Sequence, residues 1–227
     1  MLRVLPAILA SLLILAGAGL PRDGAIRERM VAVRMADGHT LFVAPVEVTD
    51  AEWARCVADR YCSPAQRLRR TQENFPATGI NWLDAQDYLA WANARSGGGL
   101  RLPTSAEWRW LNRSLEKPKP APAFTDPRLS WAAGYGQEET PGGPVQPSGS
   151  FSKTPDGISD LDGNVWEWTA SCASGGYAVL DSKDCPAFIA EGAHEAQMPL
   201  LVRNPALGGC ATGIPPTHLG LRLVADR

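Results

Sequence analysis

The stretch from Asp160 to Thr169, Asp-Leu-Asp-Gly-Asn-Val-Trp-Glu-Trp-Thr, concentrates residue types that could do chemistry. Two tryptophans flank Glu167, and a turn of Asp, Gly and Asn precedes them. Alternation along an extended strand puts both indoles on one face and the Glu167 carboxylate on the other. There the carboxylate points with Asp160 toward a shared position, where backbone carbonyls complete an oxygen cage for a hard cation such as calcium. The alternative is a tryptophan-rich core strand that follows a polar turn and holds no ion.

The five cysteines offer a second kind of chemistry. In an exported protein an oxidising compartment favours disulfides, and the close neighbours then pair as Cys56–Cys62 and Cys172–Cys185. Cys210 is left over, either as a reactive thiol or as a small buried hydrophobe. Isolated thiols are the cytosolic alternative, which the N-terminal segment argues against.

The N-terminal segment predicts export. Met1-Leu2-Arg3 forms a short positive region, residues 4–15 are almost entirely apolar, and Ala16-Gly17-Ala18 offers small residues for cleavage. The apolar run is marginally short for a bilayer span, which needs about 20 residues. We therefore predict a signal peptide over residues 1–18 rather than an uncleaved anchor. The protein is expected to be periplasmic or secreted, with membrane contact only through this segment where it stays uncleaved.

Length and composition bound the fold and the partners. A chain of 227 residues with 22 glycines, 19 prolines and 8 tryptophans predicts one loop-rich domain whose core depends on aromatic side chains. A net charge of -2 without a basic run argues against an obligatory nucleic-acid partner. We assign residues 19–29 to a charged linker and residues 30–227 to the domain.

Short elements must position the candidate residues. Alternating apolar residues on both sides of Asp37-Gly38 predict a strand-turn-strand over residues 30–48. Two capping boxes, Thr49 to Glu52 and Thr104 to Glu107, each begin a predicted helix. The remaining expectations are a helix over Leu83–Ala94, continuation of the Thr104 helix to Leu115, irregular loops over residues 117–157 and 173–203, and a last strand over Leu219–Val224.

Several motifs occur together along the chain: Glu47-Val48-Thr49, Asn81-Trp82 with Asp84-Ala85, Arg101-Leu102-Pro103-Thr104 with Glu107-Trp108, Gly163 to Trp168, and Gly220-Leu221-Arg222. Their ordered set resembles the formylglycine-generating enzyme family, also called the sulfatase-modifying factor domain. The resemblance covers residues from about 30 to 224. It implies an α+β fold, a variant C-type-lectin-like single domain with little regular secondary structure. Family members with paired cysteines after the Glu-Val-Thr helix look like this chain at Cys56 and Cys62, which favours that disulfide.

The resemblance also implies calcium ligands. The family's second calcium site uses a polar side chain before the Gly-Asn turn, two backbone carbonyls and the glutamate between the tryptophans. Carried over, these are Asp160, the carbonyls of Gly163 and Val165, and Glu167. The loop over residues 131–157, where the family's other calcium site would lie, shows no matching ligands.

The copper site of the family's enzymes is not matched. In those enzymes an Arg-Gly-Gly-Ser segment precedes two cysteines that bind copper, activate oxygen and oxidise a sulfatase cysteine to formylglycine. Copper(I) favours soft thiolates. Here the nearest segment is Leu207-Gly208-Gly209-Cys210, and Gly213 and His218 fall where the two cysteines belong. Copper is therefore not expected, and Cys210 with His218 remains the candidate for a mixed soft site or a nucleophile–base pair.

These features favour an exported, non-catalytic binding or assembly module, a pseudoenzyme on a formylglycine-generating-enzyme-like scaffold with an unidentified protein or peptide partner. One alternative is an oxidoreductase of the formylglycine-generating type with an atypical site at Cys210. The other is a formylglycine-generating enzyme in the strict sense, which acts on sulfatase peptides.

Overall fold

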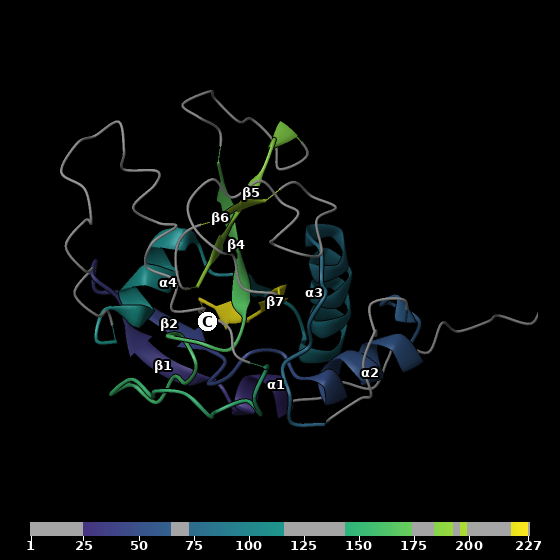
Figure 1. Ribbon diagram of the computed structural model, residues 1–227, viewed down its shortest axis with the longest axis horizontal. Coiled ribbons are helices and arrows are strands. Elements are labelled where there is room, and N and C mark those ends of the chain that lie inside the picture. Colours follow the sequence, from purple (N-terminus) through teal and green to yellow (C-terminus); the bar gives the residue numbers. More distant parts are fainter. Residues whose placement is uncertain are drawn as a thin grey trace, which may run out of the picture.

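Two small four-stranded sheets with helices packed around them make up the part of the chain that the structure describes (Figure 1). The structure is a computed structural model, and it describes residues 25–64, 73–115, 144–173, 184–192, 196–198 and 219–226.

The first sheet contains the predicted strand-turn-strand. Its strands lie in the order β1 (Val31–Arg34), β2 (Thr40–Val43), β8 (Val224–Ala225) and β3 (Leu100–Arg101), and all neighbours are antiparallel. The turn between β1 and β2 needs a positive φ, which Gly38 supplies at 91°. The local pattern therefore predicted this hairpin correctly.

The second sheet is built around the Trp-Glu-Trp strand. Its order is β6 (Ala196–Met198), β5 (Phe188–Glu191), β4 (Trp166–Cys172) and β7 (Leu219–Leu221). β5 pairs antiparallel with both β6 and β4, whereas β7 runs parallel to β4. Partners on both sides make β4 a central strand.

The last predicted strand is in fact two strands, and the prediction of one continuous strand over Leu219–Val224 was wrong. β7 pairs with β4 in the second sheet, and β8 pairs with β2 and β3 in the first. The chain crosses between the sheets at Arg222 and Leu223, both buried. Hydrophobic pattern alone could not reveal the crossing, because the chain is buried on both sides of it.

Helices α2 (Asp50–Ala58), α3 (Trp82–Ser96) and α4 (Ser105–Asn112) each begin at a complete capping box. The Thr49 and Thr104 boxes were predicted. The third, Asn81 with Asp84, was missed as a cap, and it starts α3 at Trp82. α4 ends at Asn112, short of the predicted Leu115.

The end of the predicted linker packs against the domain. Residues Ala25–Glu28 form the short helix α1, in which Ile26 is buried. The guanidinium of Arg27 donates a hydrogen bond to the carbonyl of Gly98, just after α3. Residues 25–28, which the sequence assigned to the linker, thus form a helix that contacts the domain.

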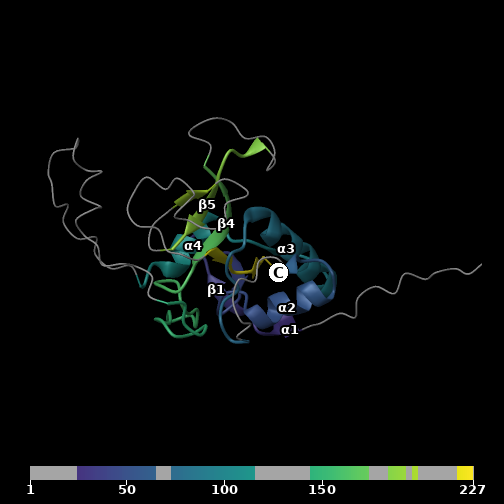
Figure 2. The same ribbon diagram turned by 45° about the vertical axis from the view of Figure 1, so that its right-hand side comes forward.

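Two hydrophobic cores fill the interior. The larger one contains Trp166 and Trp168 together with the aromatic residues of α2 and α3, and the smaller one contains Trp108 of α4 with apolar residues of β1 and β2. Figure 2 shows α1, α2 and α3 gathered on one side of the molecule and α4 on the other. Aromatic stacking contributes to the larger core, as between Trp82 and Phe188, whose ring centroids lie 3.5 Å apart.

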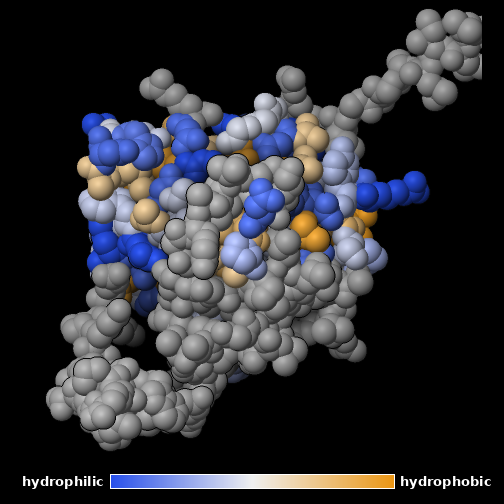
Figure 3. All heavy atoms as spheres, turned by 90° about the horizontal axis from the view of Figure 1, so that it is seen from above, coloured by the Kyte–Doolittle hydropathy of each residue, from blue (hydrophilic) through white to orange (hydrophobic). Residues whose placement is uncertain are grey.

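In the view of Figure 3, the described residues on the surface are mostly hydrophilic, with small hydrophobic patches between them. Among the residues that the structure describes, no helix combines the length and apolar character needed to cross a bilayer.

Candidate functional site

Strand β4 places its Trp-Glu-Trp segment between the two cores, as the alternation predicted. The indole of Trp168 donates to the carbonyl of Ile80 at 2.8 Å within the larger core. Gly192, just after β5, lies against the Trp166 ring, where a Cβ atom would collide with the indole. Glu167 points the other way, where the Trp108 indole donates to its Oε2 at 2.8 Å.

The main partner of Glu167 is Arg222, which the sequence had placed only in a terminal motif. Nη2 of Arg222 lies 2.7 Å from Oε1 of Glu167, and its Nε lies 3.0 Å from Oε2. Both side chains are fully buried. The other donors of Arg222 reach the carbonyls of Ala44 and Ser159, each at 2.9 Å. Arg222 therefore ties β4 to two loops at the point where the chain crosses between sheets.

Asp160 organises the turn before β4. Its carboxylate accepts hydrogen bonds from the backbone amides of Gly149 and Phe151, and its own φ is 70°. The Phe151 ring covers Gly163 so closely that any Cβ atom there would clash. Asn164 also has a positive φ, 68°. The Asp-Gly-Asn turn is thus a tightly packed structural feature, and each of its polar side chains has a defined partner.

Glu47 is the functional candidate that the sequence reasoning missed, although it belongs to the Glu-Val-Thr motif. It is 1% exposed, its Oε1 accepts from the Asn164 amide at 3.1 Å, and its Oε2 has no hydrogen-bond partner among the described residues. Burial raises the pKa of Glu47 to about 8, against the lowering effect of Arg222, and the charges of Glu167 and Asp160 raise it further. The side chain is therefore protonated over most of the physiological pH range.

The hydrogen bonds that Glu167 and Asp160 already accept limit how calcium can bind at the predicted ligands. Oε1 and Oε2 of Glu167 each accept two hydrogen bonds, which fills the four lone-pair positions of the carboxylate. Asp160 already accepts two amides. Calcium takes six to eight oxygen ligands in proteins. As they stand, these residues fit calcium poorly, because an ion would have to displace donors from Glu167; calcium at Asp160, Gly163, Val165 and Glu167 stays a prediction.

Another buried glutamate lies directly opposite Glu167. Glu191 of β5 is the cross-strand partner of Glu167 and is 3% exposed. It accepts hydrogen bonds from the Ser105 hydroxyl and from Nε of Arg109, the latter at 2.9 Å. Ser105 and Arg109 belong to α4, as does Trp108, so the two glutamates together dock α4 onto the sheet. Two like charges on opposite strands repel each other. Here each glutamate pairs with its own arginine, Glu167 with Arg222 and Glu191 with Arg109.

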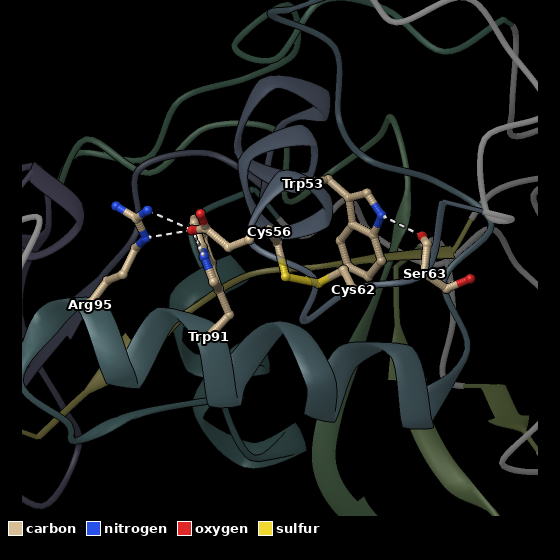
Figure 4. The surroundings of a disulfide bond; sticks show 7 residues. Trp53, Cys56, Cys62, Ser63, Trp91 and Arg95 are labelled. Carbon is tan, nitrogen blue, oxygen red and sulfur yellow. Dashed lines mark hydrogen bonds and ion pairs between the residues drawn. A yellow bond between two sulfur atoms is a disulfide. The ribbon is translucent and has the colours of Figure 1, made fainter. Parts of the chain in front are cut away.

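Both predicted disulfides are present. Cys56–Cys62 links the end of α2 to the turn after it, and Cys172–Cys185 links the end of β4 to the segment before β5. Figure 4 shows the first of these next to Trp53, whose indole donates to the carbonyl of Ser63 at 3.4 Å.

On the other side of this disulfide, α3 is attached to the end of α2. The indole of Trp91 and the guanidinium of Arg95 both bind the carboxylate of Asp59 (Figure 4), with Arg95 Nε at 2.8 Å. These partners hold the pKa of Asp59 below its ordinary value, chiefly through the Trp91 hydrogen bond and then that of Arg95. The disulfide, together with the hydrogen bonds to Asp59, therefore fixes the end of α2 against α3, which is a structural role.

The predicted catalytic residues Cys210 and His218 lie outside the described residues, as does Gly213. The disulfides nevertheless constrain the chemistry. Four of the five cysteines in the sequence are cross-linked, which leaves Cys210 as the remaining one.

Together, the two small sheets, the capped helices and the buried Trp-Glu-Trp strand define an α+β domain of the formylglycine-generating-enzyme type. The sequence profile of the sulfatase-modifying factor enzyme 1-like domain matches residues 9–227. The chain belongs to this family, as its motifs indicated.

Curated relatives include proteins named as formylglycine-generating enzymes and proteins named as inactive ones. The "Inactive C-alpha-formylglycine-generating enzyme 2" of Bos taurus is 36% identical over 116 residues, a match that covers 48% of this chain and 36% of that protein. The "Formylglycine-generating enzyme" of Thermomonospora curvata is 29% identical over 131 residues, covering 48% of this chain and 37% of that protein. The matches thus span about a third of the length of these relatives.

Solved structures show the same fold. "Treponema denticola variable protein 1" aligns with a TM-score of 0.53 at 16% identity, covering 87% of this chain and 95% of that chain. PvdO from Pseudomonas aeruginosa aligns with a TM-score of 0.54 at 19% identity, covering 83% of this chain and 81% of that one. At these identities the likeness concerns the fold alone.

Proposed function

We propose that the protein is an exported, non-catalytic binding or assembly module on a formylglycine-generating-enzyme-like scaffold. The observation that carries this proposal is the pairing of the cysteines. A copper(I) site of the family's kind needs two thiolates side by side, and the two disulfides leave only Cys210 to supply one. A second thiolate would require breaking a disulfide that holds a folded element.

The relatives support the same proposal. Proteins named as inactive formylglycine-generating enzymes in Bos taurus and Mus musculus match this chain at 36% and 34% identity. In our chain the residues that hold the scaffold together, including the Glu167–Arg222 pair and three capping boxes, are all in place. A retained scaffold with a lost metal pair is the pattern expected of a domain that binds rather than oxidises.

Export is supported by two independent features. The N-terminal residues have the pattern of a signal peptide over residues 1–18. The domain also carries two disulfides, which persist in oxidising compartments such as the periplasm or the extracellular space. The partner we propose is a protein or peptide that meets the domain there.

Calcium is a separate proposal. What supports it is buried negative charge, because the carboxylates of Asp160 and Glu167 both act on the guanidinium of Arg222 while Glu47 is protonated. Calorimetric titration of the purified protein with calcium should show binding that Glu167→Gln removes. Equal affinity in the two proteins, or none in either, would reject the site.

The main experiment separates a binding module from an oxidase. Wild-type protein with intact disulfides and the Cys210→Ser variant are titrated with copper(I), and both are incubated with a sulfatase-motif peptide under oxygen. We expect no turnover and no stoichiometric copper binding in either protein. Tight binding that Cys210→Ser abolishes would instead support an oxidoreductase with an atypical site at Cys210, and peptide turnover would support a formylglycine-generating enzyme in the strict sense.

A further inference from the structure

Three side chains from distant parts of the sequence bring metal-ligand atoms together at the surface. His39 precedes β2, Glu107 lies in the first turn of α4, and Asp226 follows β8. One ligand atom from each lies within 4.8 Å of the ligand atoms of the other two. An imidazole nitrogen combined with carboxylate oxygens is a ligand set that Zn²⁺ takes in proteins. We propose that His39, Glu107 and Asp226 form a zinc-binding site.

The imidazole is already oriented for this role. Nδ1 of His39 lies 2.5 Å from Oδ1 of Asp37. Oδ1 of Asp37 also accepts a hydrogen bond from the backbone amide of His39, at 3.0 Å, and an ionised carboxylate can only accept hydrogen bonds. Nδ1 therefore carries the proton, and Nε2 is left as the ligand atom. A carboxylate that binds the second nitrogen of a ligand histidine is the usual outer-shell partner in zinc sites.

Arg101 holds the two carboxylates in place. Its Nη2 lies 2.7 Å from Oε1 of Glu107 and 2.5 Å from Oδ1 of Asp226. Its Nη1 also binds Oε2 of Glu107 at 2.8 Å. Oε2 of Glu107 also accepts the Thr104 amide at 2.7 Å, which fills both of its lone pairs. Oε1 of Glu107 and the two oxygens of Asp226 each accept one bond from Arg101, so each keeps one position for a metal. The arginine fixes the spacing of the ligand atoms, since it joins two segments that are far apart in the sequence.

The charge of the cluster also favours a dication. Asp37, Glu107 and Asp226 contribute three negative charges, and Arg101 contributes one positive charge. These four groups together carry a net charge of about -2, which a single Zn²⁺ balances. His39 and Asp226 have exposed side chains, 41% and 65%, so an ion can enter from solvent. Three protein ligands leave a fourth tetrahedral position for water.

Zinc titration of the full chain by calorimetry tests the proposal. We expect one strongly bound Zn²⁺ per chain, and a loss of affinity of at least tenfold in each of His39→Gln and Asp226→Asn. Asp37→Asn, which removes only the outer-shell partner, should weaken binding about 10- to 100-fold. Substitutions at these exposed positions should leave the urea unfolding midpoint in metal-free buffer unchanged, which separates loss of a ligand from loss of the fold.

Matched controls come from other residues that could bind zinc. His194→Gln and Cys210→Ser should leave the affinity unchanged. Co²⁺ in place of Zn²⁺ provides a second measurement, because its visible absorption should appear in the wild type and disappear in His39→Gln. Absence of binding in the wild type, undiminished binding by His39→Gln, or loss of binding in either control would overturn the proposal.

Discussion

Glu47 makes the stability of this domain depend on pH, and Glu47→Gln should remove that dependence. In the folded protein burial raises the pKa of Glu47 to about 8, whereas the ordinary value for a glutamate is 4.5. Glutamine resembles the protonated carboxylic acid in shape, and its carbonyl oxygen can still accept the hydrogen bond from Asn164. The variant therefore removes the titrating group at position 47 and changes little else.

The direction in which stability changes with pH follows from the number of protons that each state binds. Between pH 4.5 and about 8 the folded state keeps the Glu47 proton, whereas the unfolded state has lost it. Stability falls with rising pH wherever the folded state binds more protons. This contribution is fully present below pH 4.5 and is lost as the pH rises through the folded pKa. A difference of 3 to 4 pKa units corresponds to on the order of 5 kcal/mol at most, at about 1.4 kcal/mol per unit.

Urea unfolding at pH 5, 6, 7 and 8, with a chelator present so that no divalent cation competes with the proton, measures the effect. The wild type should lose stability steadily over this range. Glu47→Gln should lose much less and should be the more stable protein at pH 8. The control is Glu73→Gln, at an exposed glutamate, which should follow the wild type. A wild-type slope that persists in Glu47→Gln would refute the reasoning.

Three further predictions concern stability, each measured by urea unfolding. Arg222→Met should cost about 3–5 kcal/mol because it leaves Glu167 charged and buried, and adding Glu167→Gln should recover part of the loss; a cost within 1 kcal/mol would contradict the buried pair. Replacing Cys56 and Cys62 together by alanine should lower the free energy of unfolding by about 2 kcal/mol, the chain entropy of a loop closed over six residues. Because the variant lacks this disulfide, a reductant should have no further effect on the α2 segment. Thr104→Ala should cost about 1 kcal/mol, since it removes the N-cap of α4, whereas Thr104→Ser should be nearly neutral.

Local patterns predicted much of the fold. The hairpin around Gly38 and the helices after Thr49 and Thr104 depend on neighbouring residues only, so the sequence was enough to locate them. The cysteine pairs were also predicted, because partners separated by 6 and 13 residues are close in the chain whatever the fold. The family followed from motifs in a fixed order.

The charged partners of the candidate site could not be predicted in this way. Glu167 was identified from its tryptophan neighbours, but Arg222 is 55 residues away and its position depends on where the chain crosses between sheets. Glu47 and Asn164 are 117 residues apart. Spacing along a strand gives the face on which a side chain lies, but it does not give the group that meets it there.

The sequence by itself therefore determined the family, the capped helices, the hairpin and the cross-links, because each depends on short-range geometry or on an ordered set of motifs. Only the tertiary structure decided that Glu167 binds an arginine and that His39 meets Glu107 and Asp226. It also decided that Glu47 is buried with one oxygen that has no partner among the described residues. The physical reason is that the charge state and ligand capacity of a carboxylate depend on its neighbours in space, and folding brings those neighbours from distant segments.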